Sequence, residues 1–231
     1  MDTLGDLATG TGDGTAVRVG DGRTYTRGEF AETATKASNF FRFHGARSGA
    51  RVGIVTAPDP KPVLGVFGAA LLGAPVDPDP GGEFDGALLL APTAELEEYD
   101  PAPGCTRVAF GAEPDDPRIE YFERGVWSEN PIAPDAGIEE DAAALVAGGE
   151  TYTHARLLDA AGAVVASAGI EAGEAVALRA GMADPRALVA GVLAPLLAGA
   201  TVVLAPATPA DVGVGRDVPE ARAIDPAEVP L

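Results

Sequence analysis

Four segments of the chain place apolar residues at the three- and four-residue spacing of a helix. These segments are residues 26–44, 62–72, 153–168 and 184–198. The buried stripe predicted for the first consists of Phe30, Ala34, Ala37 and Phe41. Short apolar runs bounded by Gly and Pro separate the helices, which is typical of strands buried on both faces of a parallel sheet. We expect such strands at 16–19, 51–56, 142–146, 176–178 and 201–204.

Polar residues mark the predicted helix ends. Thr26 and Glu29 have the spacing of a capping box, in which each side chain accepts a hydrogen bond from the other residue's amide. Thr153 and Asp184 are placed to cap the third and fourth helices, and Gly199 should end the fourth.

The two halves of the chain carry the same order of features. Residues 22–26 (GRTYT) return as residues 149–153 (GETYT). Each copy is followed by a helix, a strand, a second helix and a Gly-Ala step into a further strand. This order predicts an α/β protein of two pseudo-repeated βαβαβ lobes with mostly parallel sheets.

The predicted lobes suggest where the domains lie. We expect a first α/β lobe with an irregular middle layer at 1–130, a second lobe at 131–210 and a C-terminal tail at 211–231. The middle stretch has strand-like islands at 87–90, 107–110 and 119–122. Residues 206–231 are rich in Pro and Asp, so we expect them to be frayed or draped over the surface.

Charge and composition narrow the setting of the protein. The chain has 35 acidic and 16 basic residues, a formal net charge of −19 and only two lysines. Such a surface repels nucleic acid and anionic lipid, and it resembles proteins of salt-loving microbes; an acidic protein of a GC-rich organism is the alternative. Acidic residues stand where a signal peptide needs positive charge, which favours a cytoplasmic protein.

Two further features have simple structural interpretations. The uncharged segment 187–210 is long enough to span a membrane, but its counterpart in the first half, 62–76, is short and interrupted by Gly-Ala-Pro. We therefore predict a buried helix followed by a strand, and no membrane span. Cys105 is the single cysteine, which excludes an intrachain disulfide and predicts a packed residue beside the strand at 107–110.

The order and spacing of these motifs resemble the N-terminal part of the adenylate-forming acyl-CoA synthetase superfamily. The matching residues in the first half are 22–26, 29–30, Gly45, Gly49, 51–54 and 73–78. Those in the second half are 141–145, Thr153, His154, Gly169, Gly173 and 193–204. The resemblance implies paired α/β lobes. In the full enzymes it also implies a third subdomain and a mobile C-terminal domain with a catalytic lysine, so we expect a truncated relative.

One segment departs from the family pattern. In the family, a Ser/Thr/Gly-rich loop ending in Pro-Lys-Gly holds the ATP phosphates between the strand at 143–146 and the Thr-His pair. Here only residues 147–152 (AGGETY) fill that place, without serine or lysine, and Glu150 adds negative charge. The segment is either a shortened phosphate cradle or a turn that leads to Thr153 as helix cap. The candidate cradle residues are Gly148, Gly149, Thr151 and Thr153.

His154 is a further candidate, because the resemblance places it where the family often has a histidine that shapes the acyl pocket. The alternative is a polar residue in the first turn of a helix. Acidic doublets such as Asp77 with Asp79 lie in predicted loops and are expected to be solvated rather than to bind metal.

Three functional hypotheses follow. The preferred one is a truncated, catalytically inactive acyl-CoA synthetase-like protein that regulates or binds a full-length synthetase, or binds an acyl, ATP, AMP or CoA ligand. The second is a residual enzyme of the AMP-forming acid–thiol ligase class that uses an acyl-adenylate or a CoA ligand and is completed by a partner chain. The third is a structural protein that forms homodimers.

Overall fold

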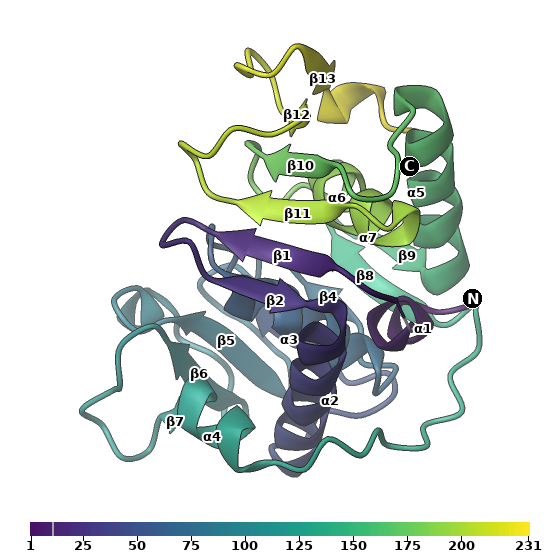
Figure 1. The fold of residues 1–231 in the computed structure, drawn as a ribbon. Coiled ribbons are helices and arrows are strands. Elements are labelled where there is room, and N and C mark those ends of the chain that lie inside the picture. The colour runs from purple at the N-terminus through teal and green to yellow at the C-terminus, as the bar shows by residue number, and fades with distance from the viewer. Residues whose placement is uncertain (11) are drawn as a thin grey trace.

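Two mostly parallel sheets organise the computed structural model, which describes residues 1–10 and 12–231 (Figure 1). The six-stranded sheet has the order β13 (Arg222–Ile224), β12 (Val212–Val214), β10 (Ala175–Leu178), β11 (Thr201–Leu204), β1 (Thr15–Val19), β2 (Thr24–Thr26). The seven-stranded sheet has the order β7 (Glu120–Tyr121), β6 (Thr106–Phe110), β5 (Leu88–Pro92), β3 (Val52–Ile54), β4 (Val76–Asp77), β8 (Ala143–Ala147), β9 (Glu150–Thr153). The predicted α/β class with mostly parallel sheets is confirmed.

The two halves of the chain exchange their hairpins. The antiparallel hairpin β1–β2 comes from the first half but extends the six-stranded sheet, where Val17 pairs with Val202 of β11. The hairpin β8–β9 comes from the second half but extends the seven-stranded sheet, where Leu145 pairs with Val76 of β4. A division of the sequence near residue 130 therefore does not separate one sheet from the other.

Helices connect the parallel strands, and their ends follow the sequence. They are α1 (Leu4–Thr9), α2 (Arg27–Phe43), α3 (Pro60–Ala70), α4 (Phe122–Ser128), α5 (His154–Ala168), α6 (Pro185–Leu188), a π-helical segment (Val189–Leu193) and α7 (Ala194–Ala198), with 3₁₀ turns at Leu96–Glu98 and Pro226–Glu228. The predicted capping box of Thr26 and Glu29 is present, and Thr153 and Asp184 cap α5 and α6. Gly199 ends α7 in a left-handed conformation, with φ of 80°.

Helix α3 is buried on all sides except at Lys61. A Cβ at Gly65 would lie 2.9 Å from Leu90 of the seven-stranded sheet, and a Cβ at Gly68 would lie 2.9 Å from Ala37 of α2. These glycines allow α3 to fit between sheet and helix, so its apolar sequence reflects burial in the protein core. In the described part of the chain, no helix is long and apolar enough to cross a membrane.

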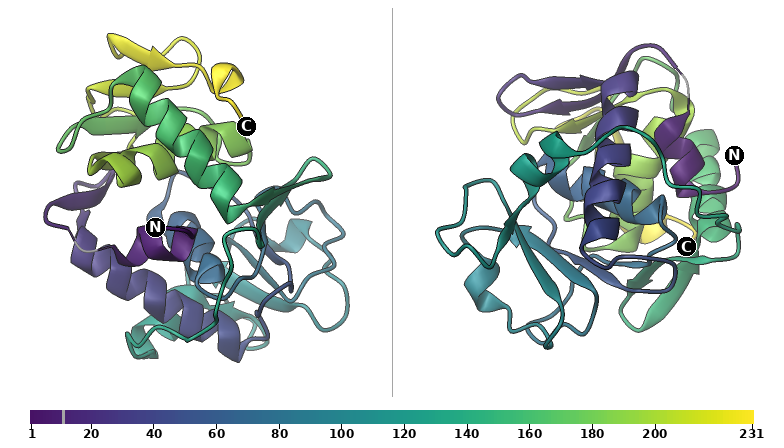
Figure 2. Two further views of the ribbon diagram at one scale, coloured as in Figure 1. Left: turned by 90° about the vertical axis from the view of Figure 1, so that its right-hand side faces the viewer. Right: turned by 90° about the horizontal axis from the view of Figure 1, so that it is seen from below.

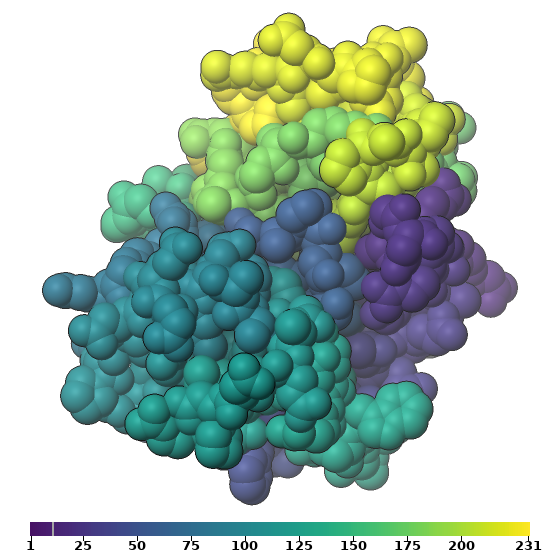
Figure 3. All heavy atoms as spheres, turned by 90° about the vertical axis from the view of Figure 1, so that its left-hand side faces the viewer, coloured from purple at the N-terminus to yellow at the C-terminus, as the bar shows by residue number. Residues whose placement is uncertain are grey.

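The C-terminal residues differ from the expectation. Instead of a frayed tail, Val212–Val214 and Arg222–Ile224 form parallel strands that continue the six-stranded sheet beyond β10. All three residues of β12 are buried, and the strand pairs with the backbone edge of β10 that β11 leaves free. Figure 3 shows these residues (yellow) stacked on the green residues of the second half.

Two smaller differences lie in the first half. The short helix α1 was not predicted; Thr3 and Asp6 form its capping box. The island at 119–122 forms a strand only over Glu120–Tyr121, because Phe122 begins α4 and its ring packs against Phe40 and Phe41 of α2. Both chain ends lie on the same side of the molecule (Figures 1 and 2).

Candidate functional site

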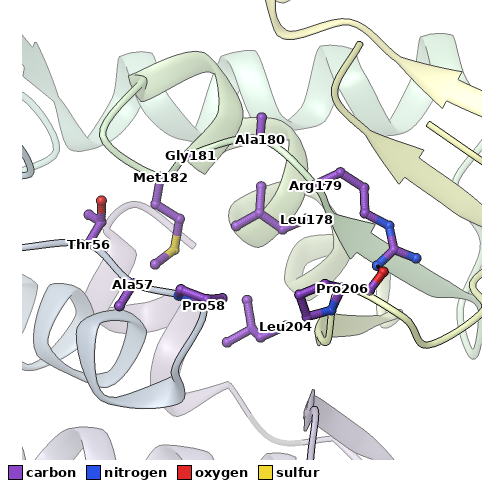
Figure 4. Close-up of a pocket in the computed structure, with 10 residues that line it drawn as sticks. All are labelled: Thr56, Ala57, Pro58, Leu178, Arg179, Ala180, Gly181, Met182, Leu204 and Pro206. Atoms are coloured by element: carbon purple, nitrogen blue, oxygen red, sulfur yellow. Dashed lines mark hydrogen bonds between the residues drawn. The ribbon is translucent and has the colours of Figure 1, made fainter. Parts of the chain in front are cut away.

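A cavity of about 290 Å³ lies between the two sheets, and we call it the inter-lobe pocket (Figure 4). It is formed where β3, β10 and β11 end. In the seven-stranded sheet, β4 lies on one side of β3 and the next strand, β5, lies on the other. In the six-stranded sheet, β11 and β12 flank β10 in the same way. Open α/β sheets bind ligands outside the carboxyl ends of strands at such reversals. The lining residues are Thr56, Ala57, Pro58, Leu178, Arg179, Ala180, Gly181, Met182, Leu204 and Pro206.

The wall of the inter-lobe pocket is mostly apolar. The side chains of Leu178 and Met182 lie on one side of it and face Pro58 and Leu204 on the other (Figure 4). The Thr56 hydroxyl stands at one end. Such a wall favours the uncharged, apolar part of a small ligand.

Arg179 is the one charged residue among those that line the pocket. Its guanidinium points away from the centre, and its side chain is 11 % exposed. Nη1 donates to the carbonyls of Ala205 (2.6 Å) and Pro206 (2.8 Å), and Nη2 donates to that of Thr208 (2.7 Å). Nε and Nη2 also donate to the same carboxylate oxygen of Glu220, with Nε at 3.2 Å. All five N–H groups of the guanidinium therefore have acceptors in the protein.

Glu220 is the buried counter-ion of Arg179. Its side chain is 3 % exposed, and the hydrogen bonds from Arg179 hold the pKa of its carboxyl below the usual value. Oε2 is buried without a hydrogen-bond partner in the described part of the chain. A Cβ at position 213 would lie 2.3 Å from this oxygen, so Gly213 provides the room for the carboxylate.

The segment that offered either a shortened phosphate cradle or a turn forms a tight hairpin turn. Gly148 and Gly149 have φ of +59° and +80° and connect β8 directly to β9, with Ala147 opposite Glu150. Positive φ at both central residues is the geometry of a two-residue hairpin turn, which glycine adopts without strain. The side chain of Glu150 accepts hydrogen bonds from Arg156 (2.7 Å) and Tyr152 (3.0 Å), and these lower the pKa of its carboxyl.

The other sequence candidates are already occupied or turned away. Thr151 is exposed on β9, and the hydroxyl of Thr153 accepts the Arg156 amide as the cap of α5. His154 is completely buried. None of the five candidate residues lines the inter-lobe pocket. No group of residues suited to hold a metal ion occurs among the described residues.

His154 joins α5 to the N-terminal helix. Its Nδ1 accepts the Leu4 amide at 3.2 Å, so the ring is neutral and carries its proton on Nε2. Nε2 is buried and has no partner within the described chain. Burial lowers the pKa of His154, against a smaller opposing effect of Asp6. The residue is thus a structural acceptor beneath α1.

This geometry predicts a loss of stability in mild acid. Because the pKa of His154 is lowered by folding, the unfolded chain takes up a proton near pH 6.5 before the folded one does. The contribution of neutral His154 to the free energy of unfolding is fully present above that pH. It is lost as the pH falls toward the pKa of the folded state, at no more than about 1.4 kcal/mol per pH unit. Urea unfolding between pH 5 and 8 should show this slope in the native chain.

The matched variant is His154→Asn, which retains an acceptor for Leu4 but does not titrate. Its free energy of unfolding should change less between pH 6.5 and 5 than that of the native chain. If the free energy of unfolding changed equally with pH in the two proteins, His154 would not contribute to the acid sensitivity.

Few residues pointed to the inter-lobe pocket before its geometry was known. Leu178 and Leu204 stand at the ends of predicted strands, where a ligand crevice is expected in this type of sheet. An arginine such as Arg179 ordinarily pairs with a carboxylate. Its partner Glu220, however, lies in the C-terminal segment that we expected to be frayed or draped over the surface. Their pairing depends on the two unpredicted strands β12 and β13.

Comparison with known proteins finds likeness in fold. No protein-family model and no curated protein matches the sequence. The solved structures that are similar include the anthranilate CoA ligase AuaEII in complex with anthranoyl-AMP, with a TM-score of 0.77, 15 % identity and coverage of 92 % of this chain and 49 % of that one. A benzoate CoA ligase from Burkholderia xenovorans has a TM-score of 0.72 and 19 % identity, with coverage of 93 % and 50 %. MatB from Rhodopseudomonas palustris has a TM-score of 0.74 and 11 % identity, with coverage of 93 % and 49 %.

The chain therefore has the fold of the N-terminal domain of adenylate-forming CoA ligases, and the predicted resemblance is confirmed for the fold. It spans about half the length of these similar chains.

Proposed function

We propose that this chain is a non-catalytic, acyl-CoA synthetase-like protein that binds the acyl part of a ligand in its inter-lobe pocket. It regulates a full-length synthetase by binding the acyl ligand that the synthetase uses, and either delivers that ligand to the synthetase or keeps it away. The observation that carries the proposal is the tight turn at Gly148 and Gly149. ATP-dependent chemistry needs amide and cationic groups that hold phosphates, and this turn is followed by the carboxylate of Glu150.

The pocket supports the binding part of the proposal. Its volume of about 290 Å³ and its apolar wall suit a ring or a short chain. Two of the similar structures are named for ring acids, anthranilate and benzoate. We infer that a ring-sized acyl group is the best match for this chain.

Two measurements on the purified chain test the proposal. Pyrophosphate exchange with ATP, Mg²⁺ and benzoate should be absent, because the phosphates have no cradle at the hairpin. Benzoyl-AMP should raise the melting temperature, since a ligand that binds only the folded state at about 100 times its Kd adds about 2.7 kcal/mol of stability.

The control for binding is Ala57→Phe, which places a ring in the inter-lobe pocket. This variant should fold and lose the benzoyl-AMP shift. Exchange activity in the native chain would refute the non-catalytic assignment, and an equal shift in the variant would place the ligand elsewhere. The two alternative hypotheses, an enzyme completed by a partner chain and a structural protein that forms homodimers, stay predictions.

A further inference from the structure

A buried glycine lies directly behind one wall of the inter-lobe pocket. Gly191 is in the π-helical segment between α6 and α7, and it does not itself line the cavity. Such π-helical turns are rare and occur frequently at functional sites. A Cβ at position 191 would lie 2.5 Å from Cδ1 of Leu178 and 3.2 Å from its Cβ. Leu178, which lines the cavity, therefore stands between the cavity and Gly191.

The close approach of Leu178 explains why position 191 is a glycine. Glycine weakens a helix relative to alanine, so a glycine inside a helix needs a structural reason. The backbone conformation gives none, because Gly191 is helical and is not among the glycines with positive φ. The three atoms nearest to an added Cβ all belong to Leu178. Any larger residue would therefore force Leu178 or the helix to move.

The helix has little room to retreat from Leu178. Ala190 and Val192, the neighbours of Gly191, are completely buried, as is the rest of the π-helical segment. Within the sheet, Leu178 pairs with the buried Val214 of β12. The cavity is the open space that Leu178 borders, so an added Cβ would drive its side chain into the cavity.

The first half of the chain contains the same packing without a cavity. Gly65 and Gly191 stand at equal spacing before the Gly-Ala step of their own half. Each lies behind the last residue of an inner strand, Ile54 of β3 or Leu178 of β10. A Cβ at Gly65 would lie 3.1 Å from Cδ1 of Ile54. Ile54 is completely buried, whereas Leu178 borders the inter-lobe pocket, so in the second half this packing controls the size of a cavity.

We propose that Gly191 is a positioning residue that sets the size of the acyl group in the inter-lobe pocket. By letting Leu178 lie back against the helix, Gly191 leaves room for a ring-sized acyl group. With a side chain at position 191, the pocket would take only a short acyl group such as acetyl. The inference rests on the proposed function and adds how the pocket selects its acyl group by size.

Benzoyl-AMP and acetyl-AMP form a matched pair of probes, because they share the AMP part and differ in the size of the acyl group. In calorimetric or thermal-shift titrations, Gly191→Ala should bind benzoyl-AMP at least about tenfold more weakly than the native chain, with little change for acetyl-AMP. Removing the displaced side chain should reverse the effect. The double variant Gly191→Ala/Leu178→Ala should therefore regain most of the affinity for benzoyl-AMP.

Two further variants separate the roles of the two residues. Gly162→Ala is the control for the substitution itself, because Gly162 lies in α5 and a Cβ there would meet no atom within 4 Å. It should leave the affinities for both probes unchanged. Leu178→Ala enlarges the pocket while Gly191 stays in place, so it should bind naphthoyl-AMP at least about tenfold more tightly than the native chain does.

The double variant also decides the matter if Gly191→Ala does not fold. It should fold and bind benzoyl-AMP, because the added Cβ then has no leucine side chain to meet. A double variant that stayed unfolded would show that the Cβ meets another part of the chain, and this would overturn the inference.

The remaining outcomes distinguish the inference from the proposed function. If Gly191→Ala bound benzoyl-AMP as tightly as the native chain, or lost acetyl-AMP together with benzoyl-AMP, the inference would be overturned and the proposed function would stand. If the native chain bound neither probe, both would be overturned.

Discussion

Replacing Arg179 with methionine should lower the free energy of unfolding by about 3–5 kcal/mol, because it leaves the Glu220 carboxylate buried without a counter-ion. The substitution also removes the donors to Ala205, Pro206 and Thr208, so the segment over the pocket loses its anchor. Urea unfolding followed by circular dichroism measures this loss. We expect a midpoint at a lower urea concentration and a similar m value, since the surface exposed on unfolding is nearly unchanged.

The control for Arg179→Met is the double variant Arg179→Met/Glu220→Met, which removes both charges. Replacing a buried pair by apolar side chains of similar volume is often close to neutral. The double variant should therefore recover much of the stability that the single variant loses. A double variant as unstable as the single one would mean that lost packing, and not the unpaired charge, causes the effect.

Phe67→Ala should cost about 3–5 kcal/mol as well, through a cavity in the core. Phe67 is fully buried on α3, and its ring meets that of Phe30 on α2 edge to face, with centroids 5.3 Å apart. Because α3 fits tightly between α2 and the seven-stranded sheet, its neighbours have little freedom to fill the space. Unfolding by guanidinium chloride measures the change.

Phe43→Ala is the matched control, because Phe43 is 82 % exposed at the end of α2. We expect a change within about 0.5 kcal/mol. If the Phe43 variant lost as much stability as the Phe67 variant, a cavity in the core would not be the cause of the loss.

Local sequence signals predicted most of the helices and buried strands. The helix starts were predicted from the capping residues Thr26, Thr153 and Asp184. Each cap accepts a hydrogen bond from a backbone amide two or three residues ahead, so its effect does not depend on the rest of the chain. The stripe from Phe30 to Phe41 likewise depends only on helical geometry.

Features that depend on distant partners were missed. Val212–Val214 is a strand because the edge of β10 is available to it, and nothing in its three residues distinguishes it from a loop. The role of His154 depends on the Leu4 amide, which is remote in sequence. The same reason hid the pairing of Arg179 with Glu220.

The exchanged hairpins have a consequence for synthesis on the ribosome. Strand β1 is made before the other strands of its sheet, but it finds its parallel partner only when β11 has left the exit tunnel, since Val17 pairs with Val202. Until then the edge of β1 that faces away from β2 has no native neighbour. The six-stranded sheet therefore has a high contact order, which slows folding and leaves apolar surface exposed to chaperones while the chain folds.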